Sequence, residues 1–260
     1  MAEEHVIAMR GLAFSYDRRC AFIDGLSVGF VSGAVTGIVG PNGCGKSTLL
    51  KLASGMLVPQ AGDVLLDGRP VSSYGAKERA RKLALLSQGL RPPAMTVAAL
   101  ASCGRFAHTG GFGAMSREDE KAVERALEAT DMADLRDCEL ARLSGGQRQR
   151  AFIAMVLAQD ADTILLDEPT TYLDIGACHD VMRLVRRLNE EEGKTTVLVI
   201  HDLDLALRYC DRLVVMDRGR IVCSGATEDV FAAGAIQSAF GVSVHEFDAN
   251  GRRAYAVFPR

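Results

Sequence analysis

Several features that would assign a chain to a class at once are absent from this sequence. No window approaches 18 uninterrupted apolar residues, so we expect no segment that spans a membrane as a helix. The first residues, Met1 to His5, are acidic and lack the charged-then-apolar pattern of a secretory signal. Internal repeats and low-complexity segments are also missing. These absences favour a soluble globular protein.

No two cysteines have the CxxC spacing of a zinc or redox site. Scattered cysteines are typical of a reducing compartment rather than of a disulfide scaffold, so we expect a cytosolic protein. The seven are Cys20, Cys44, Cys103, Cys138, Cys178, Cys210 and Cys223.

An excess of positive charge is missing as well. The net charge is −3, which gives no indication of a protein that binds nucleic-acid phosphates. Two arginine groups are interpreted as solvated helix faces in preference to a nucleic-acid surface: Arg148 with Arg150, and Arg183 with Arg186 and Arg187. With 260 residues, the chain can bury a substantial core as one domain or one and a half.

The apolar pattern of the sequence predicts alternating strands and helices. Apolar and polar residues alternate over Val6–Tyr16 and Ala21–Phe30, which predicts an antiparallel hairpin around Asp17-Arg18-Arg19. Later, short apolar runs alternate with helical patterns, which predicts a mostly parallel sheet covered by helices. We expect strands at Ala34–Val39, Asp63–Leu66, Leu83–Leu86, Thr163–Leu166, Thr195–Ile200 and Leu213–Asp217, and helices at Lys46–Ala53, Ile175–Glu192 and Asp202–Tyr209.

Strand-like runs disappear between about Gln88 and Ala141. Ser116–Ala129 has an apolar face, and Ser116 followed by Asp119 fits a helix N-terminus. We predict a parallel α/β nucleotide-binding core (about 1–87 and 161–231) with an N-terminal antiparallel β-subdomain and an inserted helical subdomain (about 88–160), together one domain. In the tail (about 232–260), short runs at Ser243–Phe247 and Ala254–Phe258 predict a small hairpin.

The motif Gly40-x-x-x-x-Gly45-Lys46-Ser47 follows a predicted strand and begins a predicted helix, which is the context of a phosphate-binding loop. Backbone N–H groups of a glycine-rich turn and of a helix N-terminus concentrate positive potential on phosphates. We expect Lys46 to reach the β- and γ-phosphates of a nucleotide, and the Ser47 hydroxyl to bind Mg²⁺.

Two acids, Asp167 and Glu168, end the apolar run Thr163–Leu166 at the point where open α/β sheets place their ligands. Asp167 is predicted to hold Mg²⁺ through water, and Glu168 to polarise an attacking water. Two solvated acids at an ordinary strand end are the alternative. The phosphate loop, and Pro169 directly after the strand, favour the catalytic interpretation.

A second anion site is predicted where Ser144, Gly145, Gly146 and Gln147 precede the apolar helical run Ala151–Ala158. A turn with a helix cap would explain this tetrapeptide taken alone. A single γ-phosphate does not need two glycine cradles from one chain. We therefore expect two chains, head to tail, each offering this site to the ATP of the other.

These motifs, with Leu173-Asp174 and His201-Asp202, occur in the order and approximate spacing of ATP-binding subunits of ABC transporters, which the chain resembles over roughly residues 5–230. The resemblance implies that Tyr16 stacks on adenine and that Gln88 senses Mg²⁺ and the attacking water. It also implies that Asp174 crosses the dimer interface and that His201 contacts the γ-phosphate.

The candidate site residues therefore form three groups, with ATP and Mg²⁺ as the ligands. The catalytic group is Lys46, Gln88, Glu168 and His201, and the Mg²⁺ group is Ser47, Gln88 and Asp167. The nucleotide-binding group is Tyr16, Gly40, Pro41, Asn42, Gly43, Cys44, Gly45, Lys46, Ser47, Thr48, Ser144, Gly145, Gly146, Gln147 and Asp174.

Two segments resemble the branch of this family that serves importers of metal chelates. Tyr172 is an aromatic residue where many members have a small one, and the short tail agrees with this branch. Cys103–His108 is similar to the Gly-Arg-aromatic-Pro-His segment of that branch, with Ala107 replacing the proline. The resemblance implies an ATPase for import of a ferric siderophore, with haem or a corrinoid as alternatives.

The same resemblance implies the partners. They are a second copy of the chain, permease subunits docked near Gln88–Arg105, and indirectly an extracytoplasmic solute-binding protein, with no nucleic acid. The chain would lie at the cytoplasmic face of the inner membrane. An exporter ATPase, an iron–sulfur assembly factor and a nucleotide-binding regulator without hydrolysis are the other classes considered. The absence of membrane spans argues against the exporter, and Glu168 beside Asp167 argues against the regulator.

Cys44 lies inside the phosphate loop, near a helix N-terminus that would lower the pKa of its thiol. One hypothesis is that modification of Cys44 obstructs ATP. The favoured interpretation is that Cys44 is a small residue that fits a tight loop.

Overall fold

The computed structural model describes residues 4–17, 22–89, 91–109, 115–248 and 253–259. The chain divides into two compact units, Met1–Ser73 with Thr195–Arg260, and Tyr74–Lys194. The predicted turn residues Arg18 and Arg19, and Cys20, lie outside the described residues. Among the described helices, none combines the length and apolarity that crossing a bilayer requires.

The first unit begins with an antiparallel sheet in the order β2-β1-β4-β5. Alternate residues of β1 are buried, Ile7 and Met9 among them, because successive side chains of a strand point to opposite faces. The predicted hairpin is confirmed, since β1 pairs antiparallel with β2. The strands are β1 (His5–Phe14), β2 (Ile23–Val31), β4 (Ala61–Leu66) and β5 (Arg69–Pro70).

A second sheet of the first unit has the order β10-β9-β3-β8, and β3 runs parallel to both of its neighbours. Every residue of β3 and β8 is buried, as expected for parallel strands covered on both faces. Helix α1 (Lys46–Ala53) follows β3, and α7 (Leu203–Tyr209) follows β8. The strands are β3 (Val35–Val39), β8 (Thr195–Val199), β9 (Arg212–Asp217) and β10 (Arg220–Ala226).

The C-terminal part of the first unit contains two short helices and a hairpin. Helices α8 (Thr227–Ala232) and α9 (Ala235–Phe240) precede β11 (Val242–Asp248) and β12 (Arg253–Pro259), which pair antiparallel. The rings of Phe231 and Tyr255 meet edge to face, with 5.4 Å between their centroids, so an aromatic contact joins the hairpin to α8. The predicted tail hairpin is confirmed.

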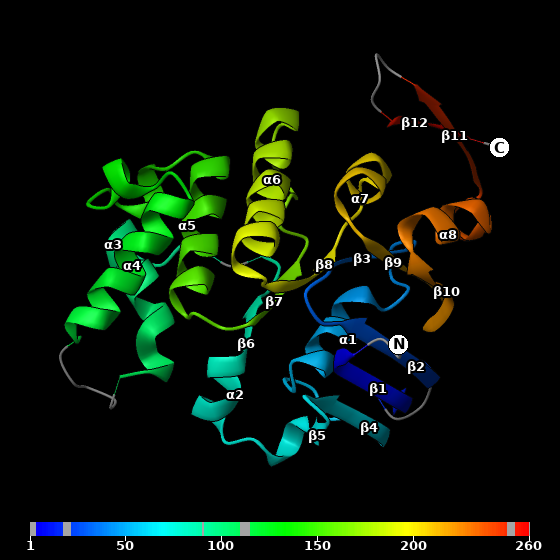
Figure 1. Ribbon diagram of the computed structural model, residues 1–260, viewed down its shortest axis with the longest axis horizontal. Helices are drawn as coiled ribbons and strands as arrows, with labels where there is room; N and C mark the ends of the chain where they lie inside the picture. The colour runs from blue at the N-terminus through cyan, green and yellow to red at the C-terminus, as the bar shows by residue number, and fades with distance from the viewer. Residues whose placement is uncertain (1–3, 18–21, 90, 110–114, 249–252, 260) are drawn as a thin grey trace. The chain divides into compact units, whose positions relative to one another are not determined.

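The second unit joins two parallel strands to a group of helices. Strands β6 (Leu83–Leu86) and β7 (Thr163–Asp167) pair in parallel. Helices α3, α4 and α5 pack against one another, and Figure 1 shows them in green. The predicted α/β fold class with its helical insertion is confirmed. The helices are α2 (Ala76–Lys82), α3 (Val97–Cys103), α4 (Arg117–Ala129), α5 (Gly145–Ala158) and α6 (Ile175–Glu192).

The segment Gly104–His108 directly follows α3 and contacts α4 and the C-terminal end of α5. Arg105 is buried, and its guanidinium pairs with Asp119 at 2.8 Å and donates to the carbonyl of Ala158 at 2.8 Å. A Cβ on Gly104 would lie 2.2 Å from the carbonyl oxygen of Met155, so only glycine fits against α5. The ring of His108 bonds the carbonyl of Gln159 at 2.8 Å. This segment therefore has a packing role in the helical group.

The same ion pair supports the start of α4. Ser116 caps the helix, its hydroxyl accepts from the backbone N–H of Asp119, and the Asp119 carboxylate accepts from Ser116 in return. The hydrogen bonds from Ser116, together with the Arg105 guanidinium, lower the pKa of Asp119 to about 2. Ser116 and Asp119 therefore form the capping box that the sequence predicts.

We predict that Asp119→Asn lowers the free energy of unfolding by roughly 3 kcal/mol at neutral pH, because it leaves the buried Arg105 without a charged partner. The folded pKa of about 2 lies below the ordinary value of 3.8. The contribution is therefore complete above the ordinary value and is lost as the pH falls through the folded value. Urea unfolding at a series of pH values measures the stability gap between wild type and variant.

The difference in unfolding free energy between wild type and Asp119→Asn should become smaller below about pH 4. Asp134→Asn, at an exposed carboxylate of the same unit, serves as control and should change the stability by less than about 0.5 kcal/mol. A gap that stays constant down to the lowest pH would contradict the ion-pair account.

Candidate nucleotide and hydrolysis site

The predicted phosphate loop leaves β3 through a point of very close packing. A Cβ on Gly40 would lie 2.2 Å from the carbonyl oxygen of Met216 on β9, so the loop passes β9 only with glycine at this position. Gly45 has a φ of +110°, in the region that favours glycine, and stands at the N-cap of α1. Within the described residues no side chain caps α1, so its first N–H groups face the loop.

Lys46 lies inside this loop and is 5% exposed. Its ammonium donates to the carbonyls of Gly40 at 2.8 Å and Pro41 at 3.0 Å, so the loop closes around its own lysine. Pro41 is half-buried, and Asn42 and Gly43 are exposed. The arrangement presents one cation and a row of backbone donors to a ligand at the loop.

Tyr16 lies next to the same helix. Its hydroxyl bonds that of Thr48, 2.9 Å away on α1, and its ring packs edge to face on Phe14 with 4.9 Å between centroids. The side chain is nevertheless 63% exposed, so a broad part of the ring faces solvent. An exposed ring held by its edge is suited to stack on a planar base.

His201 belongs to the same edge of the sheet as the loop. Ile38 of β3 pairs in parallel with Val199 of β8, and the N–H of Ile200 donates to the carbonyl of Ile38 at 3.2 Å. The two strands therefore end together, which brings the phosphate loop and the exposed His201 to one edge.

The lowered pKa that a helix N-terminus would give the Cys44 thiol is not found. Cys44 is 3% exposed, and burial raises the pKa of its thiol, an effect that the nearby Lys46 opposes only in part. A buried thiol with a raised pKa is a poor nucleophile, so the structure favours Cys44 as a small residue that fits the loop.

Gln88 and Glu168 meet because β6 and β7 run in parallel register. Leu86 pairs with Leu166, and each predicted site residue stands two positions further along its own strand. The amide nitrogen of Gln88 donates to the Glu168 carboxylate at 2.5 Å. The hydroxyl of Thr171 donates to the same carboxylate at 3.0 Å. Thr171 is absent from the predicted residues, and only its place three residues after Glu168 could have indicated it.

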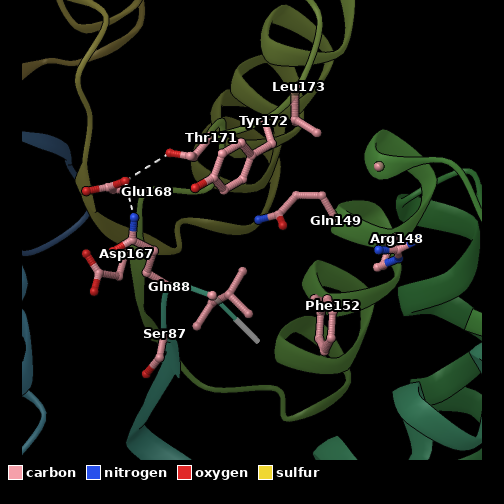
Figure 2. A pocket seen from close by; sticks show the side chains of 13 residues that line it. Ser87, Gln88, Arg148, Gln149, Phe152, Asp167, Glu168, Thr171, Tyr172 and Leu173 are labelled. Atoms are coloured by element: carbon pink, nitrogen blue, oxygen red, sulfur yellow. Dashed lines mark hydrogen bonds between the residues drawn. The ribbon is translucent and has the colours of Figure 1, made fainter. Parts of the chain in front are cut away.

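These residues line a cavity of about 160 Å³ in the second unit. Figure 2 shows Gln88, Thr171 and Glu168 on one side of it, and Gln149 and Phe152 of α5 on the other. Tyr172 is 94% exposed, and its φ of +65° is unusual for a residue with a side chain. Asp167 is buried at the end of β7 and also lines the cavity.

The glycine-rich helix start borders the same cavity through Gly145. Ser144 caps α5, its hydroxyl accepts from the N–H of Gln147 at 3.2 Å, and the Gln147 amide oxygen accepts from the N–H of Ser144 at 3.0 Å. A Cβ on Gly146 would touch the Cβ of Ala177 at 3.4 Å. Asp174 is exposed and caps α6, accepting from the N–H of Ala177 at 2.8 Å.

Each unit therefore holds its own group of predicted residues. The first unit brings together Tyr16, the loop Gly40–Thr48 and the strand end before His201. The second brings together Gln88, Asp167 and Glu168, with Gly145 at the edge of their cavity. The first group contains an ammonium and backbone N–H donors, and the second contains carboxylates. Donors and carboxylates are both used in phosphoryl-transfer sites.

The described chain contains no group of three His, Cys, Asp or Glu side chains placed to hold a metal by themselves. A metal here would need ligands from a hydroxyl, an amide or a phosphate in addition to a carboxylate. Such a mixed oxygen set is usual for Mg²⁺.

A family model described as ABC transporter matches residues 23–171, more than half of the chain. The chain is 46% identical to the probable siderophore transport system ATP-binding protein YusV of Bacillus subtilis, over 85% of its length and 81% of that protein's. It is 43% identical to the ferric enterobactin transport ATP-binding protein FepC of Escherichia coli, over 92% of this chain and 89% of that protein.

Among solved structures, the chain resembles the dimeric post-hydrolysis state of the ATP-binding cassette MJ0796 bound to ADP and Pi. The TM-score is 0.73 at 27% identity, with 85% of this chain and 98% of that one covered. The chain therefore belongs to the ABC transporter family.

Proposed function

We propose that the chain is the ATP-hydrolysing subunit of an importer for a metal chelate, and that the chelate is a ferric siderophore. The observation that carries the ATPase assignment is the pair Gln88 and Glu168, joined at the ends of two parallel strands beside a glycine-rich helix start. The names of YusV and FepC, which refer to siderophore and ferric enterobactin transport, support a ferric siderophore as the transported chelate. The corrinoid alternative is supported by 39% identity to the cobalamin import ATP-binding protein BtuD of Halobacterium salinarum, but the two siderophore relatives are more similar to this chain.

The loop Gly40–Thr48 fits a nucleotide triphosphate. The space at Gly40 is closed to any Cβ, and the uncapped first turn of α1 suits an anion. We propose that Lys46 exchanges its two carbonyl partners for the β- and γ-phosphates, which charge-assisted bonds make stronger partners. Tyr16 would carry the adenine on its exposed ring.

Mg²⁺ is the proposed metal, and Ser47, Gln88 and Asp167 are the residues that would hold it with the phosphates. The donors fit, because each of the three residues offers a hard oxygen. The Gln88 amide donates to Glu168 through its nitrogen, which leaves its oxygen to act as a ligand. Bound there, Mg²⁺ would neutralise charge on the phosphate oxygens.

Glu168 is proposed to orient the attacking water, with Gln88 beside it and His201 at the γ-phosphate. The protein would form no covalent intermediate, because catalysis of phosphoryl transfer depends mainly on positioning and electrostatics. The residues Ser144–Gln147 and Asp174 would complete the site from a second copy of the chain. The dimeric state of the ADP-bound cassette MJ0796, to which the chain is similar, supports a second copy as the partner.

The proposed assembly is a head-to-tail dimer on permease subunits at the cytoplasmic face of the inner membrane, served by an extracytoplasmic solute-binding protein. The two units, the first of which includes the tail, would act as one ATP-binding domain. Closure on ATP would bridge Lys46 of one copy to Ser144–Gly146 of the other, and hydrolysis would remove the bridge. Selectivity for the chelate would lie in the other subunits.

We predict that Glu168→Gln keeps ATP binding, loses turnover and traps the dimer, because the amide preserves the shape but does not polarise water. Phosphate release measures turnover, and size-exclusion chromatography with ATP measures the dimer. Turnover equal to that of wild type would contradict the role given to Glu168.

We predict that Ser144→Arg abolishes ATP-driven dimerisation and leaves nucleotide binding to the monomer nearly intact. The large side chain stands at the helix start that would meet the second copy, while the phosphate loop is unchanged. Fluorescent-nucleotide titration and light scattering give the two readouts. Loss of nucleotide binding in the monomer would argue against a shared site.

We predict that a strain that lacks this subunit loses uptake of radiolabelled ferric siderophore, and that the wild-type gene restores it. Glu168→Gln is the matched control and should not restore uptake, because binding without hydrolysis does not complete a transport cycle. Unchanged siderophore uptake in the deletion strain would refute the cargo assignment while leaving the ATPase assignment open to the test above.

A further inference from the structure

We propose that Thr171 is a positioning residue for Glu168 and sets the direction of its carboxylate for hydrolysis; this rests on the proposed ATPase function. Thr171 contacts no phosphate in this proposal. It acts only through Glu168.

The first support is a shared acceptor atom. The Thr171 hydroxyl donates to Oε2 of Glu168 at 3.0 Å, and the Gln88 amide donates to that same oxygen. Figure 2 shows both bonds converging on the carboxylate from two sides. Two donors on one oxygen restrict both the tilt and the rotation of the carboxylate, which a single donor would not.

The second support is the backbone between the two residues. Glu168 has a φ of +55°, a conformation that is costly for a residue with a side chain and that persists only where the surroundings hold it. The N–H of Thr171 donates to the carbonyl of Glu168 at 3.3 Å, and the N–H of Leu173 donates to that of Thr170 at 3.3 Å. These bonds close the turn, so the Thr171 hydroxyl is delivered to a fixed place.

The third support is the difference in stiffness between the two donors. Threonine is β-branched with a single side-chain torsion, and Thr171 is half-buried. Glutamine has three torsions, and Gln88 is exposed. The carboxylate direction is therefore set by Thr171, while Gln88 is the donor that can adjust its position.

The test compares Thr171→Val, which keeps the shape and removes the hydroxyl, with Thr171→Ser, which keeps the hydroxyl. In the full chain, Thr171→Val should lower kcat for ATP hydrolysis about tenfold and leave KM for ATP within about twofold, because the lost bond acts on orientation and not on binding. Thr171→Ser should restore kcat to within about threefold of wild type.

Thr163→Val is the matched control. Thr163 lies on β7 four residues before Asp167, and its buried hydroxyl has no hydrogen-bond partner in the described part of the chain, so this variant should hydrolyse ATP like wild type. Thermal unfolding and nucleotide binding of each variant report whether Thr171 serves only the fold.

Equal kcat in Thr171→Val and wild type would overturn the proposal, and so would equal losses in the valine and serine variants. A Thr171→Val protein that unfolds shifts the test to Thr171→Ser and Thr171→Ala, of which only the alanine variant should lose kcat. In a Glu168→Gln background, Thr171→Val should cause no further loss. If Glu168→Gln itself retains turnover, the proposed function has failed; if it is inactive while Thr171→Val is normal, only this inference has failed.

Discussion

Parallel pairing of buried strands is the constraint on which both groups of site residues depend. In the first unit, β3 and β8 end together, which places the phosphate loop and His201 at one edge. In the second, the register of β6 and β7 places Gln88 against Glu168. Neither pair of segments is close in sequence. The hydrogen-bond ladder sets the register, so a slip would separate the side chains that the chemistry needs together.

The N-termini of helices are the second recurring feature of the site. Among the site helices that the structure describes, some have a side-chain cap and one does not. Helices α5 and α6 are capped by Ser144 and Asp174, whose oxygens satisfy backbone N–H groups. Helix α1 begins at Gly45 without such a cap among the described residues. The uncapped start follows the phosphate loop, where the phosphate of the proposed nucleotide would take the place of a capping side chain. A glycine-rich start that already has its own cap is better suited to complete a site than to form one alone.

The motif-bearing elements can be predicted from the sequence, because strongly apolar strands and long periodic helices determine their own structure. Helix α6 has the predicted bounds, and the capping box of α4 was visible in Ser116 and Asp119. Elements with weak or short patterns were missed, such as the edge strand β10 and the six-residue helix α8. Long-range contacts were also out of reach: the Arg105–Asp119 pair, the Thr171 bond to Glu168, and the burial that raises the pKa of Cys44 depend on packing.

In the proposed dimer, each ATP is bound by the phosphate loop of one copy and the glycine-rich helix start of the other. A mixture of two variants, one with Lys46→Ala and the other with Ser144→Arg, distinguishes such a shared site from two independent sites. A mixed dimer would contain one site with both changes and one site with neither. A shared site predicts that each variant alone is inactive and that the mixture regains ATP hydrolysis. A mixture as inactive as its components, or full activity in either variant alone, would contradict the shared site.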